Sequence, residues 1–411
     1  MTAQYHLLTT RYLTRFRCLG GACEDTCCRD WNVFVDEEHY HALPARLEDP
    51  ADRAGVVKVE GGSASRYALT VLRDGDRCCH FLDAGGLCTI HGRYGEDLLP
   101  DRCATYPRIR RRVFDRVEVV ASMSCPEVAR LVLLDGDALD RVPGDLALVG
   151  RGTLRREIDE KTTHPYEANF LPVRSLAMLL LRDARFPVAS RFFFLAFLAD
   201  ASRAYLRRGA ERFDVDAMQK LARALRSAES LAALDHKLPL VEGSDRFALS
   251  VMHELIRVGL TYAPLQELLE PLLSFYAERA PAAEGEDALA ALVRGYRGLP
   301  PLPPDLGARL DELCARYATH ELLRAWFVEE TSFLSFVHQL LVRAAFVRFV
   351  VRGHAALAPP SDIAALDALV VRVTYRVARM LEGIDEIARE LARGLEASSM
   401  SLGAAVSLIR V

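Results

Sequence analysis

The sequence predicts a mainly α-helical protein, in which a small, irregular cysteine-rich module with short strands is followed by a large helical domain. Hydrophobic residues make up 51% of the 411 residues, which is enough for a packed core. Nine of the ten cysteines lie between Cys18 and Cys125. From about residue 150, apolar residues recur at spacings of three and four, as in amphipathic helices. Because a domain usually has roughly 100–200 residues, we expect two domains, at residues 1–140 and 141–411.

The first module has short strand-like segments and few long periodic stretches. The segments are Trp31–Val35, Tyr67–Val71 and Arg116–Ala121. A small module of this kind has little hydrophobic core of its own, so we expect a bound metal to supply part of its order.

The second domain carries apolar stripes of helical period. They run over Leu171–Arg182, Phe192–Arg207, Asp216–Leu238, Arg246–Leu260, Leu265–Arg279, Asp311–Ala318 and Ser361–Arg393. Pro359 and Pro360 end the preceding segment, and Ser361 is expected to cap the last helix. No uninterrupted apolar run approaches the roughly 18 residues that span a bilayer.

The net charge and the first 17 residues argue against two classes of protein, nucleic-acid binders and exported proteins. With 52 Lys and Arg against 56 Asp and Glu, the formal charge of −4 argues against a nucleic-acid binder with a broad basic surface. Met1–Arg17 is polar and basic and lacks the apolar segment of a signal peptide. We therefore expect a cytoplasmic protein with no nucleic-acid or membrane partner. In that reducing compartment, clustered cysteines indicate metal binding or redox chemistry rather than disulfides.

The cysteines fall into two groups along the chain. The first is Cys18-x4-Cys23-x3-Cys27-Cys28, and the second consists of Cys78, Cys79, Cys88, Cys103 and Cys125. Zinc and iron–sulfur clusters usually take four thiolates, so these residues fill either two sites or one site plus a reactive set. Adjacent side chains in extended backbone point to opposite faces, and we expect Cys27 and Cys28 to serve different sites. The weaker alternatives are buried cysteines that act as small hydrophobic residues, and disulfides in an exported protein.

Common nucleotide-binding and catalytic motifs are absent from the sequence. It contains no G-x-G-x-x-G after a strand, no G-x-x-x-x-G-K-[ST], no H-E-x-x-H and no G-x-S-x-G. Cys23-x3-Cys27 begins like the three-cysteine motif of radical S-adenosylmethionine enzymes. The third cysteine would fall at position 30, which is Asp30, so the motif fails.

Three weaker signals lie near the cysteines. His80 follows Cys79, and His91 lies in Cys88-x2-His91, a spacing at which a cysteine and a histidine can share a metal, although such histidines are more often surface or hydrogen-bonded residues. The arginine-rich run from Arg108 to Arg112 could meet an acidic partner or an anionic cofactor, but such a run is more often a solvated face. Ser124-Cys125-Pro126-Glu127 is typical of a capping box, in which the Glu127 carboxylate reaches back to the helix start.

Several ordered pieces of the first module resemble one family. The opening, from Phe16 to the segment Cys27-Cys28-Arg29-Asp30-Trp31, resembles that of bacterial flagellin lysine N-methylases, which are part of a wider group of cysteine-cluster proteins described as zinc- or iron-chelating. The resemblance continues through Cys79-His80-Phe81-Leu82, Gly86-Leu87-Cys88-Thr89-Ile90, Gly95-Glu96, Cys103, Tyr106-Pro107-Arg108 and Ser124-Cys125-Pro126-Glu127. It spans about residues 12–135, and the helical remainder resembles the family more loosely.

The resemblance implies a set of metal ligands and an activity. Eight cysteines fall on positions shared with the family: Cys18, Cys23, Cys27, Cys28, Cys79, Cys88, Cys103 and Cys125. Cys78 is an addition to the family's pattern, and Cys314 lies outside the segment that resembles it. The resemblance implies that a methyl group is transferred from S-adenosylmethionine to lysine ε-amines of flagellin or another lysine-bearing protein. The thiolate count is similar to that of iron–sulfur proteins, so the implied metal group is a [4Fe–4S] cluster or zinc.

Methyl transfer needs a neutral lysine amine, aligned with a sulfonium methyl, and a group that orients the amine or takes its proton. Tyr106, Glu96 and Asp36 are candidates for this role, and Trp31 and Arg108 are candidates for binding the cofactor. The alternative function is an iron- or zinc-binding protein with a redox or partner-binding role and no methyl transfer.

Overall fold

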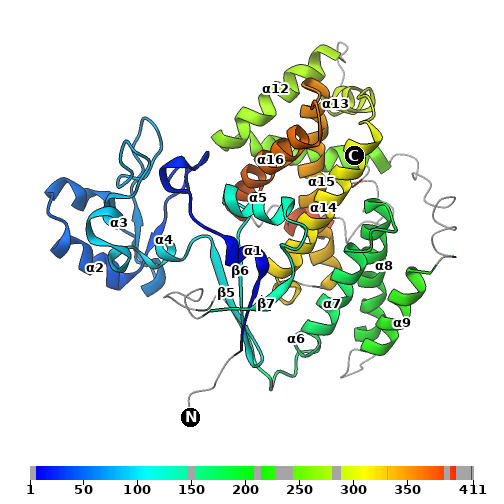
Figure 1. Ribbon diagram of the computed structural model, residues 1–411, viewed down its shortest axis with the longest axis horizontal. Coiled ribbons are helices and arrows are strands. Elements are labelled where there is room, and N and C mark those ends of the chain that lie inside the picture. Colours follow the sequence, from blue (N-terminus) through cyan, green and yellow to red (C-terminus); the bar gives the residue numbers. More distant parts are fainter. Residues whose placement is uncertain are drawn as a thin grey trace. The chain divides into compact units, whose positions relative to one another are not determined.

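The computed structural model describes residues 6–145, 154, 156–207, 214–227, 229, 244–279, 288–330, 332–383, 389–394 and 409 (Figure 1). The chain divides into two compact units. Unit 1 comprises Met1–Leu131 and Asp140–Asp159, and unit 2 comprises Val132–Leu139 and Glu160–Val411. The mainly helical fold class expected from the sequence is confirmed.

Unit 1 contains a five-stranded sheet with the order β7-β1-β6-β5-β8. The strands are β1 His6–Thr10, β5 Arg108–Val113, β6 Arg116–Ala121, β7 Arg141–Pro143 and β8 Arg156–Ile158. β5 and β6 form an antiparallel hairpin, in which Val113 pairs with Arg116 across a two-residue turn. β6 is the central strand and is buried from Val117 to Ala121, so this sheet has its own apolar centre.

Residues 18–105, which we call the cysteine lobe, contain a second sheet of three short strands in the order β2-β4-β3. The elements are β2 Phe34–Val35, β3 Val56–Lys58, β4 Ala68–Thr70, α2 Glu37–Arg46, α3 Thr89–Tyr94 and α4 Asp101–Thr105 (Figure 1). Their core consists of nine buried residues: Val35, Leu43, Leu47, Ala68, Cys79, Phe81, Ile90, Leu98 and Leu99. Strands of two or three residues and helices of five or six are too short to be stable alone, so the lobe depends on this small core and on cross-links.

Short helices connect the lobe to the five-stranded sheet. α1 (Arg11–Arg15) follows β1, and the 3-10 helix η1 (Gly20–Ala22) leads into the lobe. α5 (Pro126–Leu134) begins after β6. Cysteines lie at these connections: Cys18 follows α1, Cys23 follows η1, and Cys125 precedes α5.

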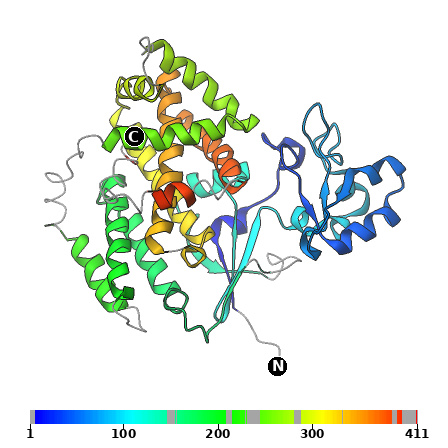
Figure 2. The ribbon, with the colours of Figure 1, turned by 180° about the vertical axis from the view of Figure 1, so that it is seen from behind.

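Unit 2 is built from helices. They are α6 Pro165–Ala168, α7 Phe170–Leu181, α8 Val188–Arg207, α9 Val215–Leu225, α11 Ser244–Gly259, α12 Ala263–Arg279, α13 Ala288–Arg297, α14 Pro304–Arg324, α15 Phe333–Leu357 and α16 Ile363–Gly383. α7, α8 and α9 pack against one another and lie side by side in both views (Figures 1 and 2).

α15 is the core helix of unit 2. It packs against α8, α12, α14 and α16 and is buried on nearly every face. By length and composition it could cross a membrane, but 94% of its most apolar window is buried inside the fold. A helix that is apolar all round is typical of a core helix as well as of a membrane span.

The sequence predicted most helices of unit 2 and missed the most buried one. α7, α8, α11 and α12 lie where the stripes placed them. The stripe Asp216–Leu238 corresponds to α9, and its residues 230–238 lie outside the described residues. The segment Asp311–Ala318 is the middle of the longer α14. No helix was expected over α13 or α15, and the statement that no apolar run approaches membrane-spanning length overlooked α15.

The start of α16 corrects one capping prediction. Asp362, not Ser361, accepts the backbone N–H of Ala365, at 2.8 Å, and its carbonyl accepts that of Leu366. A carboxylate at this position satisfies a free N–H group of the first turn and also favours the helix dipole. The predicted strands Tyr67–Val71 and Arg116–Ala121 are confirmed as β4 and β6, whereas Trp31–Val35 contains only the two-residue β2.

Candidate metal centre

Four cysteines lie at the hydrophobic core of the cysteine lobe. Cys79 belongs to that core, and Cys28, Cys88 and Cys103 pack against it as half-buried residues. Cys28 lies in a turn, Cys88 directly precedes α3, and Cys103 lies in α4. The Cys79 N–H donates to the Cys28 carbonyl at 2.7 Å, which ties two of these segments together. We call these four residues the inner set.

The thiols of the inner set affect one another's ionisation. A hydrogen bond with the Cys27 thiol is the largest cause that raises the pKa of Cys28, followed by burial and by the nearby thiols of Cys79 and Cys103. Burial raises the pKa of Cys79, and the Cys88 thiol adds to this. Neighbouring thiols resist ionising together, whereas a bound metal cation favours the thiolate form.

Four other cysteines, which we call the outer set, lie on segments outside that core: Cys18, Cys23, Cys27 and Cys125. Cys18 follows α1 and is exposed, Cys23 follows η1, and Cys125 directly precedes α5. Burial raises the pKa of Cys125 to about 12, and the thiols of Cys23 and Cys27 contribute. Burial also raises the pKa of Cys23, with smaller contributions from Cys27 and Cys18. Cys23 is thus within electrostatic range of Cys18, Cys27 and Cys125, although no three sulfurs of the described cysteines lie within 4.8 Å of one another.

A close backbone contact joins the loop of Cys18 and Cys23 to the loop before Cys88. A Cβ atom on Gly21 would lie 2.4 Å from the Gly85 carbonyl oxygen, and one on Gly86 would lie 3.3 Å from the Gly21 Cα. Gly86 also has a φ of 74°, which favours glycine. Glycines therefore let these two cysteine-bearing loops meet.

Cys27 and Cys28 lie in a turn rather than in extended backbone. The argument that adjacent side chains point to opposite faces does not apply to a turn, and their thiols are close enough to share a hydrogen bond. Cys27 also affects the ionisation of Cys23, Cys88 and Cys125. That the pair serves different sites stays a prediction.

The remaining two cysteines have other surroundings. Cys78 forms a β-bridge with Arg29 while Cys79 forms one with Leu72, so the adjacent side chains point to opposite faces. The Cys78 thiol hydrogen-bonds the Arg29 guanidinium, which raises the pKa of Arg29. Cys314 lies in α14 of unit 2, where burial raises its pKa to about 11. None of the ten cysteines, all of which the structure describes, forms a disulfide.

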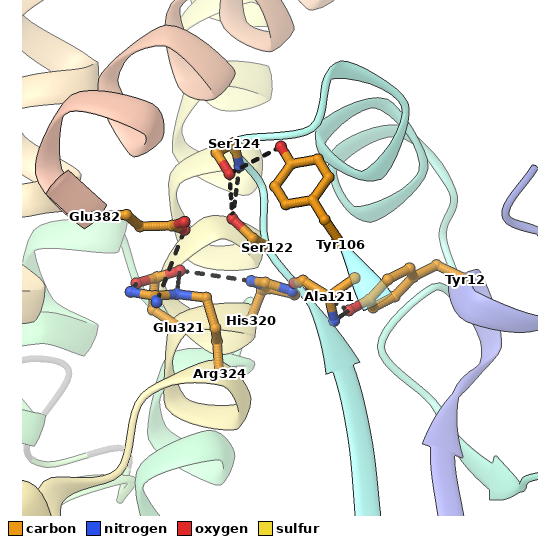
Figure 3. A network of polar contacts seen from close by, with 9 residues as sticks. All are labelled: Tyr12, Tyr106, Ala121, Ser122, Ser124, His320, Glu321, Arg324 and Glu382. Carbon is orange, nitrogen blue, oxygen red and sulfur yellow. Dashed lines mark hydrogen bonds and ion pairs between the residues drawn. The ribbon is translucent and has the colours of Figure 1, made fainter. Parts of the chain in front are cut away.

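Tyr106 and Trp31 lie beside the outer set. Their rings meet edge to face, with centroids 5.6 Å apart. The Trp31 indole N–H donates to the carbonyl of Cys27. The Tyr106 hydroxyl is 3.1 Å from that of Ser124, the residue before Cys125, and Ser124 is 2.6 Å from Ser122 (Figure 3). The structure thus brings one catalytic candidate and one cofactor-binding candidate to the same group of cysteines.

One of the two hydrogen bonds of the predicted capping box at the start of α5 is wrong, namely the bond between the Ser124 N–H and the Glu127 carboxylate. The Ser124 N–H, which the box would give to Glu127, donates to Ser122 Oγ at 2.9 Å. Glu127 instead pairs with Arg130, which also pairs with Glu24. The short Ser122–Ser124 turn holds this N–H in place before the helix begins.

The arginine-rich run is not a solvated face. It forms most of β5, an interior strand of the five-stranded sheet, and Arg110 and Arg111 are buried. Arg112 pairs with Glu157 of β8 at 2.6 Å. Arg108 begins the strand, and its Nε is buried without a hydrogen-bond partner. Arg108 therefore retains an unused donor next in sequence to the Tyr106–Pro107 segment.

Asp36 is occupied by structural hydrogen bonds. Its carboxylate accepts from the His39 N–H at 3.0 Å, lies 2.7 Å from His39 Nδ1, and accepts from the Asp101 N–H at 3.2 Å. Burial raises the pKa of Asp36, but the hydrogen bonds from His39 and Asp101 outweigh it and lower the pKa overall. Asp36, His39 and Asp101 have ligand atoms within 4.8 Å of one another, which a metal could use. Both carboxylate oxygens of Asp36 are already engaged, however: Oδ1 caps α2 through the His39 N–H, and Oδ2 accepts the Asp101 N–H.

The other sequence candidates in the lobe lie at its surface. Glu96 is exposed at the start of a 3-10 turn, and His91 is exposed on α3. His80 is 3.5 Å from Asp52 and contacts the Phe81 ring. The structure thus gives His80 a polar partner other than a metal, which agrees with the interpretation of it as a hydrogen-bonded residue.

Unit 2 contains a buried ionic group that the sequence did not reveal. Glu321 and Arg324 of α14 form a two-pronged ion pair at 2.8 and 2.7 Å, and both are at most 5% exposed. His320 Nδ1 is 3.6 Å from Glu321, and Arg324 is 3.7 Å from Glu382 of α16 (Figure 3). Burial raises the pKa of Glu321, but Arg324, His320 and Arg343 outweigh it and lower the pKa well below its usual range. Charged residues within otherwise apolar helix faces were the signal that could have found this group.

Comparison with known proteins supports a relationship to flagellin lysine N-methylases. The chain is 28% identical to a lysine-N-methylase of Salmonella typhimurium over 131 residues, and 28% identical to one of Salmonella choleraesuis over 132 residues. It is 27% identical over 131 residues to the flagellar biosynthetic protein FliU of Salmonella muenchen, of which it covers 77%. Each match takes in 31% of this chain, and the chain spans about a third of the length of the two lysine-N-methylases. No family model and no solved structure matches the chain.

Proposed function

We propose that the protein is a lysine N-methyltransferase that moves a methyl group from S-adenosylmethionine to the ε-amine of a lysine in flagellin or another protein. Two relatives bear the name lysine-N-methylase, and a third is named as a flagellar biosynthetic protein. The single observation that carries the proposal is that Tyr106 and Trp31 lie together beside Cys27 and Cys125.

The reaction assigns simple tasks to these side chains. The lysine nitrogen forms a bond to the methyl carbon, the carbon–sulfur bond of the sulfonium breaks, its electron pair stays on sulfur, and the lysine nitrogen releases a proton to water. The Tyr106 hydroxyl, held by Ser124, is suited to orient the amine. A tryptophan ring such as Trp31 can bind a cationic sulfonium, and the guanidinium of Arg108 can donate to a carboxylate.

The cysteines would hold an iron–sulfur cluster or zinc, and a bound group would fix the segments that carry Trp31 and Tyr106. A tetrahedral zinc with Zn–S distances of about 2.3 Å holds its sulfurs roughly 3.8 Å apart. Among the described residues, the ligand atoms that gather within 4.8 Å are those of Asp36, His39 and Asp101 rather than three cysteine sulfurs. The cysteine sulfurs would therefore have to move closer together to hold a single zinc.

Mass spectrometry tests the proposal. Flagellin incubated with S-adenosylmethionine and the anaerobically purified, metal-loaded protein should gain whole methyl increments on lysine. We expect Tyr106→Phe to lower the rate by at least tenfold, since one oriented hydrogen-bonding group typically contributes about 10²-fold or more. Tyr94→Phe is the matched control, because Tyr94 is a half-buried tyrosine whose hydroxyl accepts one backbone hydrogen bond. Equal rates for the two variants would remove Tyr106 from the reaction.

A metal-binding protein with a redox or partner-binding role and no methyl transfer is the second candidate. The exposure of Cys18 and of its neighbour Leu19 favours it, since a thiolate at the surface can meet another molecule. This candidate predicts that the protein binds metal while the mass of flagellin stays unchanged, and that S-adenosylmethionine does not bind the metal-loaded protein.

A further inference from the structure

We propose that Tyr40, His41 and Tyr67 form a binding site for an unmethylated lysine side chain of a protein substrate, and that Lys58 of this chain occupies the site when no substrate is bound. That the ligand is a substrate lysine rests on the proposed function. Recognition of an ammonium group by these rings does not depend on methyl transfer. The four residues lie in the cysteine lobe, and none of them is a cysteine of the inner or outer set.

Three aromatic rings gather at the surface of the lobe. The centroid of the Tyr40 ring is 5.3 Å from that of His41 and 5.2 Å from that of Tyr67, and the His41 and Tyr67 centroids are 5.4 Å apart. The ring planes are inclined to one another by 79°, 56° and 54°, so no two of them stack face to face. His41 is exposed and both tyrosines are half-buried. Such a group of rings presents electron-rich π surface to a cation.

A lysine ammonium already lies on this group of rings. Lys58 Nζ is 4.6 Å from the centroid of the Tyr67 ring, well within the limit of about 6 Å for a cation–π contact. A hydrogen bond to the Tyr67 hydroxyl is the largest cause that raises the pKa of Lys58, and Tyr40 and Glu37 add to it. The chain has only four lysines, and one of them lies here. The contact identifies the chemical group that these rings accept, a primary ammonium.

The fold fixes the two tyrosine rings, whereas Lys58 is able to leave them. Tyr40 and Tyr67 pack against the hydrophobic core of the lobe. The Tyr67 N–H donates to the Val35 carbonyl at 3.1 Å, and the Tyr67 carbonyl accepts the Val59 N–H at 2.9 Å. Lys58 is the exposed last residue of β3, and its ammonium is carried on a flexible four-carbon stem. A second lysine side chain can therefore take its place without any change in the rings.

The surroundings of the rings favour a lysine that has kept its N–H groups. The Tyr67 hydroxyl can accept a hydrogen bond from a primary ammonium, whereas a trimethylated amine has no N–H to donate. Glu37, in the first turn of α2, adds a negative charge near the ammonium. The site therefore suits the lysine of a substrate rather than a trimethylated product.

Ligand-observed NMR with the whole chain, purified without oxygen, tests the site. The probe is a capped tripeptide with a central lysine, compared with the same peptide carrying norleucine or trimethyllysine. We expect the lysine peptide to bind, the trimethyllysine peptide to bind more weakly, and the norleucine peptide not to bind. Tyr67→Leu should weaken lysine binding and Lys58→Gln should strengthen it, each by roughly two- to fivefold, the ratio expected of one exposed cation–π contact. Arg66→Gln is the matched control, because Arg66 lies 5.0 Å from the centroid of a different ring, Phe34.

His41→Ala, at an exposed position, guards against a Tyr67→Leu protein that fails to fold, and it should also weaken lysine binding. Equal affinities of wild type, His41→Ala and Lys58→Gln would overturn the site, as would a norleucine peptide that binds as tightly as the lysine peptide. Tighter binding of trimethyllysine would overturn the assignment to a substrate lysine. A chain that binds lysine as expected but methylates no flagellin would support the site and overturn the proposed function. Methylation with the same KM for flagellin in wild type, Tyr67→Leu and His41→Ala would overturn the site alone.

Discussion

The cysteine lobe of unit 1 and the helical core of unit 2 achieve order in different ways. The lobe has strands of two or three residues, short helices and nine buried core residues. Unit 2 has α15, a 25-residue helix buried on nearly every face and surrounded by other long helices. Unit 2 buries a large apolar area, whereas the lobe buries little, and four cysteines lie in or against its small core.

The comparison teaches that buried polar groups serve different purposes in the two regions. In unit 2, Glu321 and Arg324 satisfy each other inside an apolar core. In the lobe, the Cys27 and Cys28 thiols share a hydrogen bond, and neighbouring thiols raise the pKa values of Cys28 and Cys79. An ion pair carries its own opposite charge, whereas neighbouring thiols would ionise more readily beside a bound cation.

Metal removal should have the largest effect and should separate the two regions. We expect chelation under reducing conditions to abolish hydrogen-exchange protection of backbone amides in residues 28–105. Amides of α15 should keep theirs, because no cysteine of the two sets lies in unit 2. Exchange measured by mass spectrometry on the same protein before and after chelation checks this. Protection that survives in the lobe would mean that its small core is sufficient.

A cavity in the core around α15 should destabilise unit 2 and leave the cysteine lobe unaffected. Phe346 is fully buried, so Phe346→Ala should lower the free energy of unfolding of unit 2 by about 3–5 kcal/mol and leave the metal content unchanged. Urea denaturation followed by Trp326 fluorescence in a Trp31→Phe background measures it. Phe197→Ala, at a 37% exposed position of α8, should cost clearly less. Equal losses would contradict the central place of α15.

Breaking the buried ion pair should cost about 3 kcal/mol, since Glu321→Gln leaves the buried Arg324 guanidinium with only the more distant carboxylate of Glu382, 3.7 Å away. The exposed pair of Glu254 and Arg257 provides the control, and Glu254→Gln should cost less than about 1 kcal/mol. The same denaturation assay compares the two.

The ion pair also predicts a pH dependence. Arg324 and its neighbours lower the pKa of Glu321 in the folded state, so its contribution is complete above the unfolded pKa of roughly 4.3 and is lost as pH falls through the lower folded value. The stability difference between wild type and Glu321→Gln should therefore shrink on acidification below about pH 4. A difference that grows instead would show that Glu321 is not held as a carboxylate.

A methyl group at the contact between the two cysteine-bearing loops should have the smallest effect. In Gly21→Ala the Cβ meets the Gly85 carbonyl and the loops must separate, at a cost of about 1–3 kcal/mol to the lobe. We expect faster metal loss to a chelator, followed by absorption or metal analysis. Gly92→Ala is the control, because its Cβ would meet nothing within 4 Å. Identical loss rates in the two variants would show that this contact does not hold the ligands.

The sequence was most informative where local pattern decides structure. Helical stripes located α7, α8, α11 and α12, because each has one polar face. α15 was missed because a helix that is apolar all round shows no stripe. The arginines of β5 were misread because burial in a central strand depends on neighbours that are distant in sequence.

The same distinction between local pattern and long-range contacts applies to the candidate site. The cysteines and the pair Trp31 and Tyr106 were identified from sequence, through their types and through resemblance. Their grouping was not, because Cys28 meets Cys79 and Cys103 only through folding, and the turn at Cys27 and Cys28 invalidated an argument based on extended backbone. Asp36 was a plausible base by residue type, yet the structure uses its carboxylate as a helix cap.

Iron, zinc and acid-labile sulfide in the intact wild-type chain, purified without oxygen, test the central claim that the lobe is completed by metal on its cysteines. The account predicts metal bound to these cysteines, with sulfide matching the iron wherever iron is found. A protein that is fully folded, with a protected lobe, and that contains neither metal nor sulfide would contradict it.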